Sequence, residues 1–134
     1  MRILIMGGTR FIGVYLTKIL VKQGHEIVLF NRGKKPAPVE GLQQIHGDRT
    51  DAAQLKEKLE KEEFDAIFDN NGRELSDTQP LAEIFKGRVK HFVYMSSAGV
   101  YLKSDQMPHQ EGDPVDPNSR HKVKHETEAY LTEQ

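Results

Sequence analysis

A short apolar run followed directly by a glycine-rich turn opens the chain, and this feature limits the fold more than any other. Residues 2–6 read RILIM, and MGGTRFIG covers residues 6–13. The apolar run is typical of a buried parallel strand, and Gly7 stands where the chain must turn tightly. Gly13 comes one turn into the following helix, where a small residue lets helix and sheet approach closely. Together they predict a turn whose backbone N–H groups, at the helix start, face a bound pyrophosphate.

Strands and helices alternate along the rest of the chain. We expect four further strands, at residues 26–30, 42–46, 65–69 and 91–95. We expect the first helix to pack on the sheet through an apolar stripe and to end at Gly24; the stripe is Phe11, Ile12, Tyr15, Leu16, Ile19 and Leu20. The other helices are expected to start at Thr50 or Asp51, at a capping box of Ser76 and Gln79, and near Asn118 or Ser119. Residues 104–119 are polar, hold three prolines and are predicted to form a loop.

This alternation predicts an α/β fold of the Rossmann-like, doubly wound class, with a parallel sheet between two helix layers. Right-handed crossovers give the strand order 3-2-1-4-5 and place a ligand crevice at the carboxyl ends of strands 1 and 4. The chain stops where such folds usually continue with another strand. We therefore expect residues 1–134 to form one nucleotide-binding domain that is a fragment of a longer protein.

Charge content weakens a nucleic-acid-binding function without excluding it, and cysteine content excludes several kinds of site. Nineteen basic and twenty acidic residues are spread along the chain, so no basic block indicates a nucleic-acid-binding segment. The absence of cysteine removes disulfides, thiol nucleophiles and thiolate metal sites, and it fits a reducing compartment. His121 and His125 have the spacing of metal ligands, but no HExxH motif completes them and we expect no metal. The N-terminal apolar run is too short for a signal peptide or a membrane span, so we expect a cytoplasmic protein without membrane attachment.

The loop after the second strand indicates which dinucleotide would bind. It reads FNRG, with Asn31 and Arg32 and no carboxylate for the ribose hydroxyls of NAD. An arginine suits a 2′-phosphate, which favours NADP over NAD, although a solvated loop cation is the alternative. Asp48 can accept from an adenine amino group or simply form a turn. Arg10 either pairs with phosphates or fills their space.

The candidate cofactor-binding residues therefore come from four loops at the predicted carboxyl edge of the sheet. They are Gly7, Thr9, Arg10, Phe11, Ile12, Gly13, Asn31, Arg32, Asp48, Arg49 and Asn71.

Three motifs, MGGTRFIG, HGDRTD and MSSAGVY, resemble the extended short-chain dehydrogenase/reductase family, which includes NAD-dependent nucleotide-sugar epimerases and dehydratases. The resemblance implies a protein about twice as long, with a substrate-binding part after these residues. A narrower set of motifs, LFNRG, NNGRE, SSAGVYLKSD and DPNSRHKVKHETE, resembles the chloroplast stem-loop RNA-binding proteins and their cyanobacterial relatives, an atypical branch of this fold. This resemblance implies mRNA binding, ribosome association or RNA cleavage, in a cyanobacterial cytosol or a plastid stroma.

The same resemblance assigns the positions that carry chemistry in active members. It places Ser97 in the position of the catalytic serine and Lys124 in that of the lysine of the Tyr-x-x-x-Lys motif, so Arg120 stands in the tyrosine position. An arginine cannot give up its proton in a protein, so Ser97 and Lys124 are candidates for a vestigial site. Tyr101 is a weaker substitute base. Arg120 and Lys124 are one helical turn apart, so we expect them to share a helix face that can receive a phosphate; a solvated face is the alternative.

Three functions are compatible with these residues. The first is a nucleotide-binding Rossmann domain of an RNA-binding protein, and it follows from the resemblance. The alternative is an NADP-dependent nucleotide-sugar epimerase, dehydratase or reductase, supported by the glycine turn, Arg32, Ser97 and Lys124. The third is a structural module in which the cofactor site has no role. Apolar surface left open at the sheet edge also makes a homo-oligomer an expected hazard.

Overall fold

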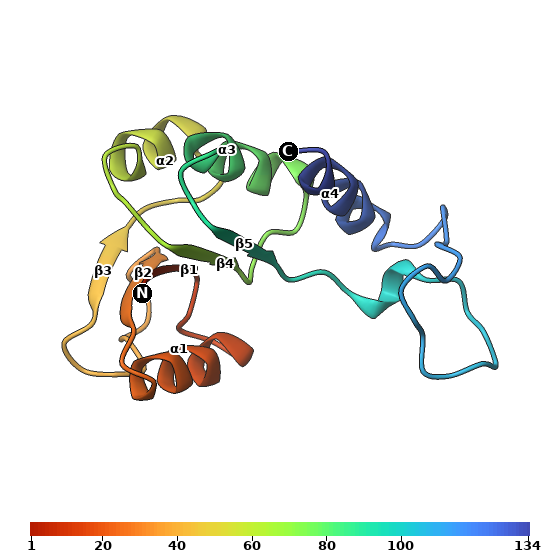
Figure 1. The fold of residues 1–134 in the computed structure, drawn as a ribbon, viewed down its shortest axis with the longest axis horizontal. Helices are drawn as coiled ribbons and strands as arrows, with labels where there is room; N and C mark the ends of the chain where they lie inside the picture. The colour runs from red at the N-terminus through yellow and green to blue at the C-terminus, as the bar shows by residue number, and fades with distance from the viewer.

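A computed structural model describes residues 1–134 and contains one five-stranded parallel sheet with helices on both faces (Figure 1). The strand order is β3-β2-β1-β4-β5, and every neighbouring pair is parallel. The strands are β1 (Arg2–Met6), β2 (Glu26–Asn31), β3 (Gln43–His46), β4 (Ala66–Asp69) and β5 (His91–Tyr94). The predicted fold class and strand order are therefore confirmed, with strand ends within a residue of the expected ones.

The helices divide unequally between the two faces of the sheet. In Figure 1, α1 (Ile12–Lys22) lies alone on one face, and the other helices lie across the opposite face. These are α2 (Ala52–Leu59), α3 (Leu75–Phe85) and α4 (Lys122–Thr132). A short 3-10 helix, η1 (Ala98–Val100), follows β5. No helix is both long and apolar enough to cross a bilayer.

Alternation along β1 builds a core on each side of the sheet. Leu4 and Met6 pack in a cluster with the apolar side chains of α2 and α3, whereas Ile3 and Ile5 pack in a second cluster with Leu20 of α1. All four β1 side chains are buried, and burying each one stabilises the fold by about 1.5–3 kcal/mol. The central strand is therefore fixed from both faces, and its carboxyl end at Met6 presents the glycine turn.

The predicted packing face of α1 is correct only for Leu16 and Leu20, which pack in the cluster with Ile3 and Ile5. Gly13, Thr17 and Leu20 are the buried residues of α1, while the expected stripe residues Phe11, Ile12, Tyr15 and Ile19 are exposed, at 85%, 55%, 69% and 54%. The orientation of α1 is set at the start of the helix, where Gly13 packs directly on Gly8. A Cβ on Gly13 would lie only 2.9 Å from the Gly8 Cα. This close approach turns the face of Gly13 toward the sheet and leaves a row of large side chains outside.

Two predicted helix starts also differ from the structure, while a third is confirmed. Asp51 caps α2 as expected, by accepting from the Gln54 N–H at 3.0 Å. The capping box of Ser76 is wrong, because α3 already begins at Leu75 and the Asp77 carboxylate accepts from the Arg73 N–H. The last helix, α4, begins at Lys122 rather than near residue 119. Residues 104–119 form the predicted loop, which an isolated bridge between Tyr101 and Val115 closes.

Candidate nucleotide-binding site

The glycine turn between β1 and α1 depends on three glycines. Gly7 and Gly8 have φ angles of +95° and +83°, a region that side chains other than glycine rarely adopt. The Gly7 N–H donates to the Phe30 carbonyl at 2.8 Å, which ties the turn to the end of β2. Gly13 must lack a Cβ because it packs directly on the Gly8 backbone. The turn is therefore held at the end of β2 and packed closely against the start of α1.

Unpaired backbone donors line this turn. None of the N–H groups of residues 8–12 has a hydrogen-bond partner, and α1 has no side-chain cap. Phe11, directly before the helix, has a φ of +46°. Adjacent free N–H groups at a helix start form a site for phosphate oxygens. The residues present thus fit the pyrophosphate of a dinucleotide. In proteins that bind such a dinucleotide for catalysis, the dinucleotide supplies hydride transfer.

A buried ion pair fills the floor beside this turn. The Arg49 guanidinium forms two bonds with the Asp69 carboxylate, at 2.6 and 2.9 Å, and a third with the Asp77 carbonyl at 2.7 Å. The Gly72 N–H and the Thr78 hydroxyl also donate to Asp69. Burial raises the pKa of the Asp69 carboxyl, but Arg49 and the other donors outweigh it and hold this pKa below its usual value.

Asn71 connects this ion pair to the glycine turn. Its Oδ1 accepts from Arg49 at 2.5 Å, so its amide nitrogen is the atom turned toward Gly7. A Cβ on Gly7 would lie 3.3 Å from that nitrogen. The predicted site residues Gly7, Arg49 and Asn71 are therefore brought together at the switch point between β1 and β4. Arg49, however, faces inward to Asp69, and only Asn71 is placed beside the turn.

Sequence reasoning missed Asp69, which is fully buried at the end of β4. A signal was available in FDAIFDNN, where a carboxylate ends an apolar strand. A buried carboxylate requires a cation or several donors. Arg49, the arginine that follows the third strand, is that cation.

The two predicted cofactor-binding residues at the end of β2 differ, because the Asn31 side chain is bonded within the protein and the Arg32 side chain is not. The Asn31 side chain donates to Gln44 at 3.0 Å and accepts from the Gly33 N–H at 2.7 Å, so both ends of its amide are used within the protein. Arg32 is exposed and forms no hydrogen bond or ion pair. The Thr50 N–H and hydroxyl hold the pKa of Asp48 below its usual value, with a smaller contribution from the charges of Arg32 and Lys34. Arg32 thus remains available to a ligand.

Ser97 and Lys124, which the motif resemblance puts in the positions of the catalytic serine and lysine, both make local contacts. Ser97 Oγ accepts from the Gly99 N–H at 3.2 Å and caps η1. Lys124 Nζ donates to the carbonyls of Gly72 at 2.8 Å and Met95 at 2.7 Å. Burial lowers the pKa of Lys124, and the charge of Asp69 partly offsets this effect. Lys124 therefore ties α4 to the ends of β4 and β5.

Arg120, which the motif resemblance puts in the tyrosine position, is directed elsewhere. It lies in the turn before α4, so the predicted helix face shared by Arg120 and Lys124 is not formed. Arg120 is exposed, and its Nε donates to the His121 ring at 3.1 Å. Tyr101, the other candidate base, stacks on His109 with ring centroids 5.1 Å apart. Tyr101 thus packs within the loop, and the tyrosine that Lys124 contacts is Tyr94, whose hydroxyl lies 3.4 Å from Nζ.

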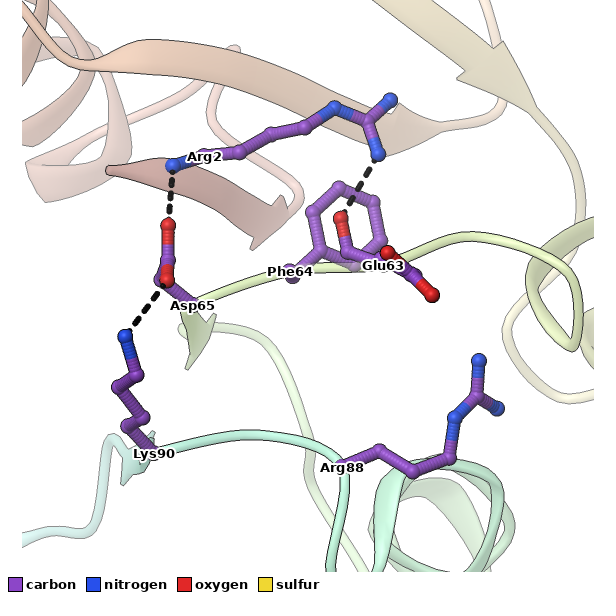
Figure 2. Close-up of a pocket in the computed structure, with 6 residues that line it drawn as sticks. All are labelled: Arg2, Glu63, Phe64, Asp65, Arg88 and Lys90. Carbon is purple, nitrogen blue, oxygen red and sulfur yellow. Dashed lines mark hydrogen bonds and ion pairs between the residues drawn. The ribbon is translucent and has the colours of Figure 1, made fainter.

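A separate hollow of about 660 Å³ lies at the opposite, amino edge of the sheet (Figure 2). Figure 2 shows the Asp65 carboxylate between the Arg2 N–H, at 2.9 Å, and the Lys90 ammonium, at 3.1 Å. Ligands of open parallel sheets bind at the carboxyl edge. We therefore interpret the ion pairs around this hollow as structural, and the hollow as separate from the candidate nucleotide-binding site.

The family described as NAD dependent epimerase/dehydratase matches residues 3–133. The chain belongs to this family. It is 49% identical, over 144 aligned residues, to the chloroplast stem-loop binding protein of 41 kDa b from Arabidopsis thaliana. That alignment covers 97% of this chain and 38% of the relative.

Solved structures agree with the fold. A UDP-glucose 4-epimerase superposes with a TM-score of 0.84 at 23% identity, over 98% of this chain and 46% of the epimerase. The Bordetella bronchiseptica enzyme WbmG, in complex with NAD and UDP, gives 0.82 at 24% identity, over 98% and 49%. At such identities the likeness shows the fold alone. The chain of this family member spans half or less of the length of these relatives.

Proposed function

We propose that this chain is the nucleotide-binding-fold part of an RNA-binding protein, in which the proton-transfer chemistry of the family's enzymes has been lost. The proposal rests on Arg120, which the motif resemblance puts in the position of the acid/base tyrosine. An arginine stays protonated at any physiological pH and cannot act as a general base. Lys124 supports the same reading, because its ammonium is bonded to two backbone carbonyls.

The partner follows from the Arabidopsis relative, which is named as a stem-loop binding protein and is 49% identical to this chain. We infer that the RNA is a hairpin and that the protein works in a cytosol or a plastid stroma. The absence of cysteine suits either reducing compartment, and the relative is named as chloroplastic.

Filter retention of a labelled hairpin RNA, measured at several salt concentrations, tests the RNA proposal. Binding that weakens as salt rises is expected, because phosphate contacts release counterions. Turnover assays with UDP-sugars and NAD(P) test the loss of chemistry. The wild-type protein is expected to show no turnover, and activity at ordinary enzyme rates would contradict the assignment of Arg120.

An NADP-dependent epimerase, dehydratase or reductase remains the second candidate, favoured by the free N–H groups of residues 8–12 and by Arg32. Calorimetric titration with NADP⁺ and then NAD⁺ tests it. Tighter binding of NADP⁺ that is lost in Arg32→Ala is expected if Arg32 receives the 2′-phosphate. Lys35→Ala, an exposed cation in the same loop, is the matched control. Binding without turnover would indicate a cofactor that regulates the protein rather than one that reacts.

A further inference from the structure

The outer face of α1 carries aromatic and basic side chains that no other part of the chain covers. We call Phe11, Tyr15, Lys18 and Lys22 the α1 stripe. Phe11 and Tyr15 are 85% and 69% exposed, and both lysines are exposed. Figure 1 shows α1 standing alone on its side of the sheet, with its far face open. Large aromatic side chains at such exposure are uncommon and mark a contact surface.

The helical members of the α1 stripe, Tyr15, Lys18 and Lys22, lie on one side of the helix. Steps of three and four residues return to the same face at 3.6 residues per turn. This helical part is about 10 Å long at 1.5 Å per residue, and Phe11 directly precedes the helix. Ile12 and Ile19, also exposed, border it on one side. The stripe is therefore a continuous strip in which aromatic rings come first and lysines follow.

The charge of this face has one sign. The sequence of α1, IGVYLTKILVK, contains no acidic residue, and the exposed Arg10 precedes it. Neither Lys18 nor Lys22 forms an ion pair or a side-chain hydrogen bond. In α2, by contrast, Lys56 and Lys58 alternate with glutamate. The α1 stripe thus leaves its positive charge without a partner inside the protein.

We infer that the α1 stripe is the RNA-contact surface, and that it binds a single-stranded segment such as a hairpin loop. Bases stack on the rings of Phe11 and Tyr15, and backbone phosphates meet Lys18 and Lys22. Aromatic platforms beside cations are the usual means of holding unpaired nucleotides. The free N–H groups of residues 8–12 adjoin the stripe at Phe11 and extend the row of phosphate donors. This inference rests on the proposed function.

A protein partner, including a second copy of this chain, fits the α1 stripe less well. Lysine is depleted at the cores of protein interfaces, where burying an ammonium without a carboxylate is unfavourable. RNA supplies a phosphate for each cation and a ring for each aromatic face. The chemistry of the stripe therefore favours RNA.

Fluorescence anisotropy of the whole protein with a labelled hairpin RNA tests the inference. Tyr15→Ala is expected to weaken binding roughly 5- to 150-fold, the range for loss of one stacked base. Lys18→Gln with Lys22→Gln is expected to reduce the slope of log K against log salt by roughly 1.4, about 0.7 per phosphate contact. Lys56→Gln with Lys58→Gln on the other side of the sheet is the matched control and leaves the affinity unchanged. All these side chains are exposed, so unchanged thermal unfolding is expected for each variant.

The outcomes separate the inference from the proposed function. If the wild-type protein binds the hairpin and the α1 variants bind equally well, the α1 stripe is not the contact surface, while the RNA function stands. If the wild-type protein has no affinity above that for an uncharged analogue, the proposed function fails and the inference fails with it. Variants that change the sedimentation coefficient but not the RNA affinity would show that a second copy covers the stripe, and would overturn the inference.

Discussion

Arg49 and Asp69 form a buried bidentate ion pair at the point where the strand order of the sheet reverses. The two bonds measure 2.6 and 2.9 Å, and the side chains are 10% and 0% exposed. The pair joins the segment after β3 to the end of β4, and the Thr78 hydroxyl connects it to α3. Through Asn71 it also fixes the position of an amide beside Gly7. One ion pair therefore organises the floor of the candidate site.

Replacing Asp69 by asparagine should destabilise the fold strongly. Arg49 would keep its charge in a buried place without a carboxylate, a change that typically costs about 3–5 kcal/mol. Urea unfolding of the wild-type and Asp69→Asn proteins measures this cost. Glu26→Gln is the control, because the Glu26 side chain is 64% exposed in its pair with Arg2 and should lose about 1 kcal/mol or less. Equal losses in the two variants would contradict the structural role of the buried pair.

The contribution of Asp69 to the free energy of unfolding should decrease at acidic pH. Its pKa in the folded protein lies below the ordinary value of 3.8, so the unfolded state binds more protons as the pH falls. The contribution is therefore complete above about pH 4 and is lost as the pH falls through the lower, folded pKa. The difference in unfolding free energy between wild type and Asp69→Asn should shrink below about pH 4. A difference that stays constant down to pH 2 would contradict the assigned direction.

Gly13→Ala should distort the glycine turn. The added methyl carbon would lie 2.9 Å from the Gly8 Cα, and neither backbone can yield without moving α1. A loss of about 1–3 kcal/mol is expected, together with loss of any nucleotide binding. Gly41→Ala is the comparison, because Gly41 has open space and only its φ of +78° is unfavourable for alanine. Its cost should be about 1 kcal/mol, without effect on nucleotide binding. Normal stability of Gly13→Ala would show that the helix start is not tightly packed.

Lys124→Met should loosen the attachment of α4. The substitution removes bonds to the Gly72 and Met95 carbonyls, and bonds from a charged donor contribute about 1.5–3 kcal/mol. Hydrogen exchange of residues 122–132 should become faster. Lys122→Met, on the same helix and exposed, is the matched control and should exchange as the wild type does. If both variants exchange alike, Lys124 does not tie the helix to the sheet.

The sheet was predictable from the sequence because apolar runs reflect burial of the strands and glycines mark the turns between elements. RILIM and EIVLF are buried strands, and their order follows from the handedness of the crossovers. The packing face of α1 was not predictable in this way. Its apolar residues cover most of the helix surface, so periodicity alone could not show that Gly13 and Thr17, rather than Tyr15 and Ile19, face the sheet.

The candidate site was predictable in part, and the limit is side-chain direction. The spacing of the motifs correctly indicated that loops containing Gly7, Arg49 and Asn71 would meet at one edge. It could not show that Arg49 turns inward, because that depends on Asp69, a partner twenty residues away on another strand. Likewise, Arg120 and Lys124 were expected on one helix face. Contacts of Ser119 with Gly99 and His121 hold the chain in a turn there, and α4 starts later.

The most direct test of the account is the affinity of the protein for a hairpin RNA, measured against a peptide nucleic acid of the same sequence, which has an uncharged backbone. If the protein binds RNA, we expect selective binding of the RNA, with log K falling linearly as log salt rises. Equal, salt-independent affinity for the two molecules, or no binding to either, would contradict the central claim that this family member binds RNA.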